Sequence, residues 1–251
     1  PYSIWLATVV VSGISYLSYL LKRYVFHESG VLVSGIIGGL YSSTATISVL
    51  ARKSRKASEQ EANEYVAAML LAVSMMFLRF MILILIFSRE IFTSIYPYLL
   101  IMSVVAAVVA WFIHSRHRRS KDMTDESEDE DSSNPLEFKV ALIFATLFVV
   151  FTVLTHYTLV YAGTGGLNLL SFVSGLSDIT PFILNLLQNT GSVAVLVVVA
   201  CSMQAIISNI LVNMFYALFF AGKGSKLRPW ILGGFGTVIG VNLVLLLFFY
   251  L

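Results

Sequence analysis

The hexapeptide Gly39-Leu40-Tyr41-Ser42-Ser43-Thr44 interrupts one apolar segment, and Gly175-Leu176-Ser177-Asp178-Ile179-Thr180 interrupts another segment 136 residues later. Gly, Leu and Thr coincide between the two hexapeptides. Each hexapeptide lies in the middle of the second of four apolar segments, and this shared context favours an internal repeat. The two interruptions therefore predict both the architecture of the chain and the position of its site.

The composition assigns the chain to a membrane. Of its 251 residues 58% are hydrophobic and only 12% are charged, and the mean hydropathy is +0.86, far above the range of ordinary soluble domains. A membrane-spanning helix needs about 20 apolar residues. Eight segments are long enough, near 3–21, 31–51, 65–87, 91–114, 138–161, 167–187, 191–221 and 229–251.

A single long polar stretch divides the eight segments into two groups of four. Residues 115–136 begin with a basic run and continue into an acidic one, which is typical of a solvated, unstructured linker. We therefore expect a first membrane repeat at residues 1–114, a charged linker at 115–136 and a second membrane repeat at 137–251.

The loop charges favour one topology. If all eight segments span the bilayer, Lys and Arg divide almost evenly between its two sides. If 31–51 and 167–187 enter and return on the same side, every loop Lys and Arg except Arg89 falls on one face, which is then cytoplasmic. We therefore predict an all-α protein of two inverted repeats, each with three transmembrane helices and one broken, re-entrant helix, and a cytoplasmic linker. Eight plain spans are the alternative.

The residues at both interruptions fit helix ends. Gly175 suits the residue after a helix, Thr180 an N-cap and Pro181 the first helical position. In the first repeat Gly38 and Gly39 precede Ser42, Ser43 and Thr44, which can cap a helix in the same way. Exposed backbone groups are costly in hydrocarbon, so a break implies a cavity or burial against protein. A continuous helix with small residues for close packing is the alternative.

Of the 14 Asp and Glu residues only Asp178, and of the 16 Lys and Arg residues only Arg79, is expected at membrane depth. Charged groups at this depth are costly and are a functional hypothesis by default. We expect the two to be charge partners across the repeats. A purely structural ion pair is the alternative.

A polar stripe in the segment 191–221 is expected to face the same cavity. Gln204, Ser208, Asn209 and Asn213 recur there at near-helical spacing, and aligning the repeats places Asn213 at the position of Arg79. The predicted substrate-binding or ion-binding residues are Ser42, Ser43, Thr44, Thr46, Asp178, Thr180, Gln204, Asn209 and Asn213. Helix association, at about 0.6 kcal/mol per polar contact, is the alternative role of the amides.

The glycine-rich run Gly233-Gly234-Phe235-Gly236 and Gly240 are expected to allow close helix packing, since Gly236 and Gly240 stand four residues apart on one helix face.

Standard catalytic signatures are missing from the sequence, including the metalloprotease and serine-hydrolase motifs. No second carboxylate within the apolar segments accompanies Asp178. We therefore expect no enzyme activity, no cofactor and no nucleic-acid partner, and the sequence assigns no metal.

The residues Gly38-Gly39-Leu40-Tyr41-Ser42-Ser43-Thr44-Ala45-Thr46, followed by Leu50-Ala51-Arg52-Lys53-Ser54 and later by Ser174-Gly175-Leu176-Ser177-Asp178, resemble a known family. It is the membrane domain of unknown function on the C-terminal side of MgtC/SapB-type proteins. The resemblance implies a multi-pass protein of the prokaryotic inner membrane that follows an N-terminal MgtC-like bundle. The family tends to carry a second acidic residue where this chain has Thr180, a departure that argues against a two-carboxylate cation site.

Two functional hypotheses follow from these features. The first is a transporter or channel for a small ion or solute, with its site at the bilayer midplane where the two broken helices meet. The second is a non-transporting membrane subunit that regulates or scaffolds a partner through the linker. Besides the lipid bilayer and the small ion or solute, a homo-oligomer is compatible with the sequence.

Overall fold

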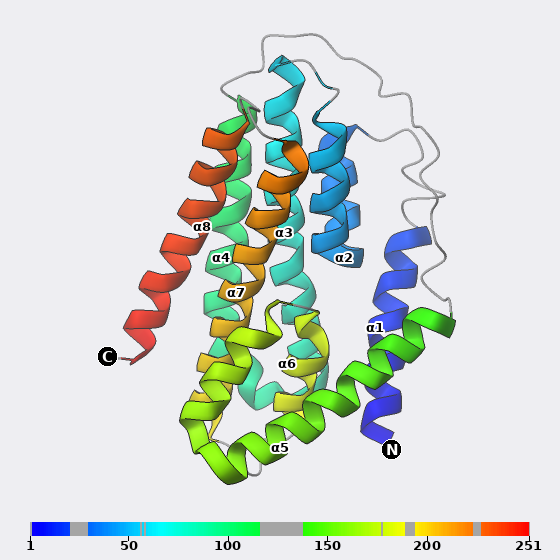
Figure 1. Cartoon of the computed structure of the whole chain (residues 1–251), viewed down its shortest axis with the longest axis vertical. Coiled ribbons are helices and arrows are strands. Elements are labelled where there is room, and N and C mark those ends of the chain that lie inside the picture. The colour runs from blue at the N-terminus through cyan, green and yellow to red at the C-terminus, as the bar shows by residue number, and fades with distance from the viewer. Residues whose placement is uncertain are drawn as a thin grey trace.

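The computed structural model describes residues 2–20, 30–55, 57, 59–115, 138–176, 178–188, 194–222 and 227–250. All of the regular elements in these ranges are α-helices (Figure 1). They are α1 (Tyr2–Leu20), α2 (Val31–Lys53), α3 (Glu59–Phe87), α4 (Arg89–Ser115), α5 (Phe138–Ser174), α6 (Ile179–Gln188), α7 (Val195–Ala221) and α8 (Arg228–Tyr250). The predicted linker, apart from Ser115, lies outside the described residues.

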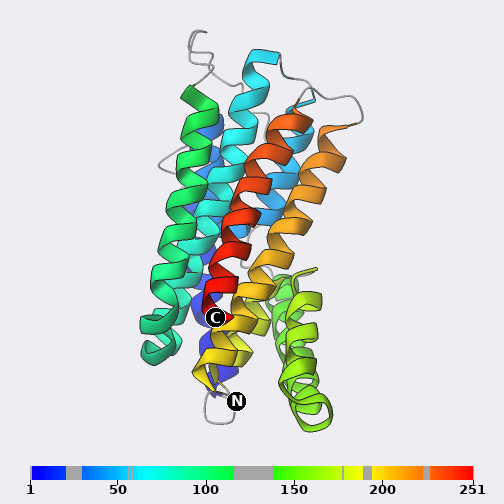
Figure 2. The same ribbon diagram turned by 90° about the vertical axis from the view of Figure 1, so that its left-hand side faces the viewer.

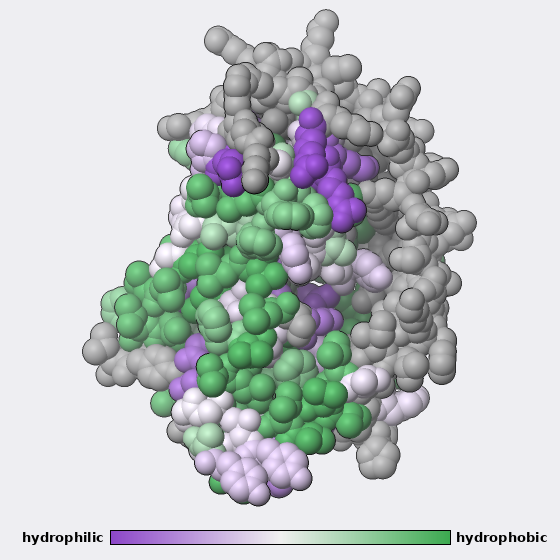
Figure 3. Space-filling model, in the orientation of Figure 1, coloured by the Kyte–Doolittle hydropathy of each residue, from purple (hydrophilic) through white to green (hydrophobic). Residues whose placement is uncertain are grey.

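Five helices of the described chain are long and apolar enough to cross a membrane, namely those at Val31–Lys53, Asn63–Phe87, Arg89–Ser115, Val195–Ala221 and Arg228–Phe248. Large apolar side chains are exposed along them, such as Trp111 and Phe215. In Figure 3 apolar residues cover much of the described surface, and hydrophilic residues gather toward its upper end. This surface is that of a multi-pass membrane protein, in which lipid covers the apolar band.

Helix α2 is broken at Ser42. This residue is extended, with φ −156° and ψ 107°, and its Oγ accepts a hydrogen bond from the backbone N–H of Ala45 at 3.3 Å. Ser42 is therefore the N-cap of a second half-helix. A Cβ added at Gly38 would collide with the Thr46 side chain, although a straight helix would separate these residues by about 12 Å. The chain consequently folds back at Ser42.

The second half of the chain contains a matching interruption. Helix α5 turns at Gly163, which has φ 58° and ψ −150°, and it ends at Ser174. Residues 175–178 then lead into α6. Figure 1 shows α2 in the upper half of the bundle and α6 in the lower half, with both interruptions near mid-height, and Figure 2 shows the same division from the side. We call Tyr41–Ser43 the α2 break and residues 175–178 the α6 break.

Glycines at both breaks serve close helix packing. A Cβ at Gly39 would lie 2.5 Å from Cα and 2.7 Å from O of Ala72 on α3, and Gly35 meets Ala68 one turn earlier. A Cβ at Gly175 would lie 2.6 Å from Oγ of Ser208 and 2.8 Å from O of Ala205 on α7. The interrupted segment in each half of the chain therefore lies close against one helix of that half, α3 or α7, since only glycine permits so close an approach.

The glycines of α8 pack only in part as the sequence predicts. A Cβ placed on Gly234 would lie 2.8 Å from Cδ1 of Leu70 on α3 and 3.3 Å from Cδ1 of Ile113 on α4, so close helix packing is confirmed there. No atom outside the local helix lies within 4 Å of a Cβ placed on Gly233, Gly236 or Gly240, so the expectation is wrong at these positions. A four-residue glycine spacing reports only that two positions share a face, not that another helix lies on it.

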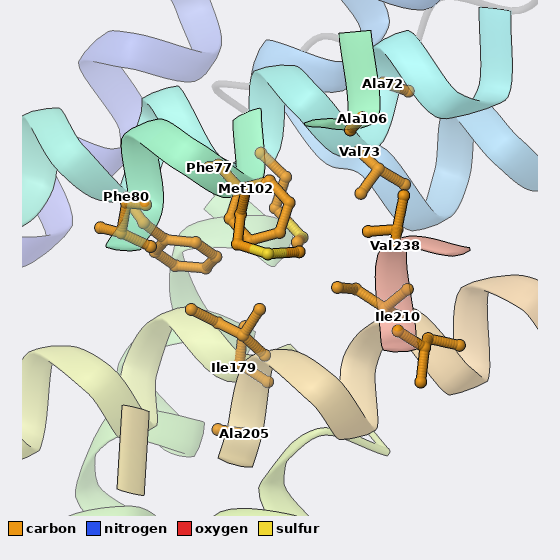
Figure 4. Close-up of a cluster of buried hydrophobic side chains, with 14 of the residues drawn as sticks. Ala72, Val73, Phe77, Phe80, Met102, Ala106, Ile179, Ala205, Ile210 and Val238 are labelled. Carbon is orange, nitrogen blue, oxygen red and sulfur yellow. The ribbon is translucent and has the colours of Figure 1, made fainter. Parts of the chain in front are cut away.

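The core is centred on α3. Phe77 and Phe80 are fully buried, and Figure 4 shows them with Met102 of α4, Ile179 of α6 and Ile210 of α7 in one cluster. Helices of both repeats therefore share one core. Buried polar pairs supplement it: the Tyr98 hydroxyl donates to Asn242 Oδ1 at 2.5 Å, and the hydroxyls of Ser74 and Ser103 lie 2.9 Å apart.

The two repeats also touch at the ends of α2 and α7. The guanidinium of Arg52 lies 4.3 Å from the ring centroid of Phe220, and Arg55 Nη2 donates to the Phe219 carbonyl at 3.1 Å. Carbonyls in the last turn of a helix have no partner within it, so Arg55 satisfies one of them.

Candidate functional site

Arg79 of α3 joins the two breaks. Its Nη1 donates to the Tyr41 carbonyl at 2.8 Å, and its Nη2 donates to Thr180 Oγ1 at 2.9 Å. The first acceptor belongs to the α2 break and the second to the first turn of α6. One charged side chain therefore connects two interruptions that lie in different halves of the chain.

Asp178 caps α6 and interacts electrostatically with Arg79. Its Oδ1 accepts a hydrogen bond from the Thr180 backbone N–H at 2.9 Å, and its carboxylate interacts favourably with the Arg79 guanidinium. The hydrogen-bonded connection between the two charges runs through Thr180, which bonds Arg79 with its hydroxyl and Asp178 with its backbone. Asp178 is exposed whereas Thr180 is buried, so the carboxylate is the accessible member of the group.

The start of α6 differs from the sequence prediction. Thr180 is not the N-cap and Pro181 is not the first helical residue, because α6 begins at Ile179 and Asp178 is its cap. Aspartate is at least as good an N-cap as threonine, and its charge also favours the positive end of the helix dipole. The Thr180 hydroxyl can then accept from Arg79. Gly175 also differs, since positive φ occurs among the described glycines at Gly163 and Gly222 and not there.

The Arg79 guanidinium keeps unused hydrogen-bonding capacity. Its Nε is buried and has no hydrogen-bond partner, and its Cζ lies 5.4 Å from the ring centroid of Phe80. A guanidinium has five N–H donors, of which two are used by Tyr41 and Thr180. The side chain is only partly buried as a whole, so a small acceptor entering the site would find donors available.

Asn209 and Asn213 of α7 form a corresponding connection to the α6 break. Asn213 Nδ2 donates to Asn209 Oδ1 at 3.2 Å, and Asn209 Nδ2 donates to the Gly175 carbonyl at 3.4 Å. Arg79 and this asparagine pair thus each hold a carbonyl of the break in their own half of the chain. The position aligned with Arg79 in the sequence is the neutral Asn213, so the first half supplies the positive charge of the site and the second half supplies the negative charge of Asp178.

The remaining predicted residues are distributed around the breaks. Ser43 is buried, and Thr44 accepts through its carbonyl a hydrogen bond from Ser48 Oγ at 2.8 Å. Thr46 packs against Gly38 inside the folded α2. Gln204 lies farther along α7, where its Oε1 is 2.9 Å from Ser171 Oγ on α5. Gln204 therefore belongs to a helix–helix contact and not to the Arg79 group.

One member of the site escapes sequence reasoning. Tyr41 contributes a backbone carbonyl, and any residue type could do so; its only signal is its place directly before the capping Ser42. Ser208, which belongs to the predicted polar stripe, is buried beside Gly175 with an Oγ that has no hydrogen-bond partner.

Comparison with known proteins assigns a family. The model of the domain of unknown function DUF4010 matches residues 9–221. The chain belongs to this family. The match to DUF4010 includes both breaks and Arg79. An uncharacterized protein of Aquifex aeolicus (strain VF5) is 27% identical over 221 residues, which covers 87% of this chain and 94% of the relative. No solved structure matches this DUF4010 protein.

Metal ligands do not gather at this DUF4010 site. Within the described residues no group of three or more His, Cys, Asp and Glu side chains could hold a metal ion. The chemistry on offer consists of one carboxylate, one guanidinium, hydroxyls and backbone groups. These groups can bind and orient a small polar species.

Proposed function

We propose that this DUF4010 protein is a membrane transporter or channel for a small ion or solute, with its site at the α2 and α6 breaks. The single observation that carries the proposal is Arg79, bonded at once to the Tyr41 carbonyl and to Thr180 Oγ1. A guanidinium between two interrupted helices is costly in lipid and is typical of a substrate or ion pathway. It also gives a direct mechanical connection between the two repeats.

The proposal extends to the arrangement in the membrane. Transporters built from inverted repeats place their sites at interrupted helices near the bilayer midplane. The sharp fold of α2 at Ser42, the matching interruption before α6 and the equivalent packing of Gly39 and Gly175 support such repeats. In this proposal α2 and the α5–α6 segment are re-entrant from opposite sides of a prokaryotic inner membrane. The linker 115–136 is cytoplasmic, and the domain accompanies an MgtC/SapB-type bundle.

Flux through liposomes tests the proposal. The purified protein is reconstituted, and stopped-flow light scattering follows volume changes in sodium, potassium and ammonium salts and in small uncharged solutes. We expect the wild type to accelerate at least one of these volume changes. Asp178→Asn should return the rate to that of empty liposomes, because the carboxylate that balances Arg79 is lost. Glu90→Gln removes an exposed carboxylate at the start of α4 and serves as the matched control.

The same assay distinguishes transport from the regulatory hypothesis. Under transport, deletion of residues 122–132 of the linker should leave the flux unchanged. A wild-type rate in Asp178→Asn together with loss of function on deleting 122–132 would refute the transporter and favour a docking subunit.

A further inference from the structure

The charge balance of the site limits what it can carry. Arg79 and Asp178 are the charged residues at the two breaks, joined through Thr180, and their charges sum to zero. Of the helices that pack on α6, α7 bears no Asp, Glu, Lys or Arg. Helix α5 contributes the exposed His156 and, at its first turn, Lys139, and α3 carries Arg79 itself and, in its first two turns, Glu59, Glu61 and Glu64. Binding of a species that leaves the site with a net charge in this low-dielectric region costs several kcal/mol or more. The species that bind favourably are therefore those that, taken together, keep the site neutral.

We infer that the site binds one small monovalent anion together with one proton, the anion at the Arg79 guanidinium and the proton on the Asp178 carboxyl. This inference rests on the proposed function and specifies its substrate class. In the empty site the Asp178 carboxylate balances Arg79. When the proton neutralises Asp178, the anion takes over that role, and the total charge stays at zero.

The geometry supports an anion at Arg79. The guanidinium has a buried Nε without a hydrogen-bond partner, and Nη1 and Nη2 already point to the two breaks. An anion there can accept charge-assisted hydrogen bonds from the planar donor set. The α2 break adds to this preference. Its second half-helix has the neutral cap Ser42, whereas α6 has the charged cap Asp178, so the positive end of the α2 half-helix lacks a compensating charge.

The geometry also supports a proton at Asp178. The carboxylate is not enclosed by protein atoms. Its Oδ1 is occupied by the Thr180 N–H, and no group of three or more His, Cys, Asp and Glu side chains that could hold a metal ion exists within the described residues. A metal site built from several charged side chains is therefore not on offer there, whereas a proton needs a single carboxylate oxygen.

Anion-dependent thermal stability of the purified full chain tests this inference. Chloride, nitrate and formate are added as sodium salts, with sodium gluconate as the bulky balancing salt. The pH is varied from about 8 down to about 4, close to the ordinary pKa of an aspartate carboxyl. We expect at least one small anion to raise the Tm, with a lower apparent Kd at lower pH. Where Asp178 is mostly ionised, the apparent Kd for the anion should rise about tenfold for each unit of increase in pH, because one proton binds together with each anion.

Variants separate the two partners. Asp178→Asn resembles the protonated carboxyl, so its Tm should still respond to the anion but without dependence on pH. Arg79→Gln should lose the response, and Arg79→Lys should keep a weaker one, which preserves the test if the glutamine variant does not fold. Arg89→Gln and Glu90→Gln remove exposed charges at the start of α4 and should behave like the wild type.

Three results would overturn the inference. One is a wild-type Tm that responds to none of the three anions at any pH, and another is a response in Arg79→Gln equal to that of the wild type. The third is a shift that follows the cation when sodium is exchanged for potassium or magnesium. Liposome flux without an anion-dependent Tm would refute the inference and leave transport standing, whereas an anion-dependent Tm without flux would refute transport.

Discussion

Replacement of Gly39 by alanine tests whether the close approach of α2 to α3 holds the α2 break in place. The new Cβ would lie 2.5 Å from Cα and 2.7 Å from O of Ala72. Comfortable carbon–carbon contact begins at about 3.5 Å, so the helices must separate by about 1 Å at this point. A gap of that size forfeits a quarter to a half of the dispersion energy of the neighbouring contacts. Overpacking of this kind costs about 1–3 kcal/mol.

A glycine in the open provides the matched control for this prediction. Gly236 lies inside α8, and no atom outside the local helix is within 4 Å of the position that a Cβ would occupy there. Gly236→Ala therefore gains helix propensity without a collision. Both substitutions share that propensity gain, and their difference isolates the packing cost. We expect Gly39→Ala to be less stable than Gly236→Ala by about 1–3 kcal/mol.

Unfolding by sodium dodecyl sulfate in mixed micelles, followed by circular dichroism, measures the difference. The colliding atoms of Ala72 are backbone atoms, so the additional substitution Ala72→Gly should not restore stability. Equal stabilities of Gly39→Ala and Gly236→Ala would refute the reasoning. Rescue by Ala72→Gly would show that the contact is made by side chains instead. The displacement of about 1 Å should also lengthen the 2.8 Å bond from Arg79 to the Tyr41 carbonyl and lower the flux in liposomes.

Two further substitutions test buried hydrogen bonds by the same unfolding measurement. Thr180→Val removes the oxygen that accepts a hydrogen bond from Arg79 Nη2. It should lower the free energy of unfolding by about 1–3 kcal/mol, because a donor inside the protein loses its partner. The control Thr237→Val, at an exposed position, should lower the free energy of unfolding far less, and equal losses in the two variants would argue against the Arg79–Thr180 bond. Tyr98→Phe leaves the buried Asn242 without its hydroxyl partner and should cost a similar amount. Its control is the exposed Tyr96→Phe, expected within about 0.5 kcal/mol of the wild type, and a neutral Tyr98→Phe would contradict the prediction.

Local chemistry made the helices and one interruption predictable. The predicted segments 31–51 and 91–114 agree with α2 and α4 to within about two residues, because apolar length is a local property. Ser42 lies among the predicted capping residues and caps the second half of α2. The cap of α6 was misassigned to Thr180 because Asp178 and Thr180 are both competent caps two residues apart. The choice between them depends on Arg79, which occupies the Thr180 hydroxyl.

The sequence by itself determined that this is a helical membrane protein with two interrupted segments and two unusual charges, since composition and capping residues act over a few neighbours. Only the tertiary structure decided which groups those charges contact. Arg79 reaches Tyr41, 38 residues away, and Thr180, 101 residues away, and no local pattern specifies such partners. The glycines show the same division: Gly39 meets a helix and Gly236 meets none, because close packing depends on what lies opposite a residue and not on the residue alone.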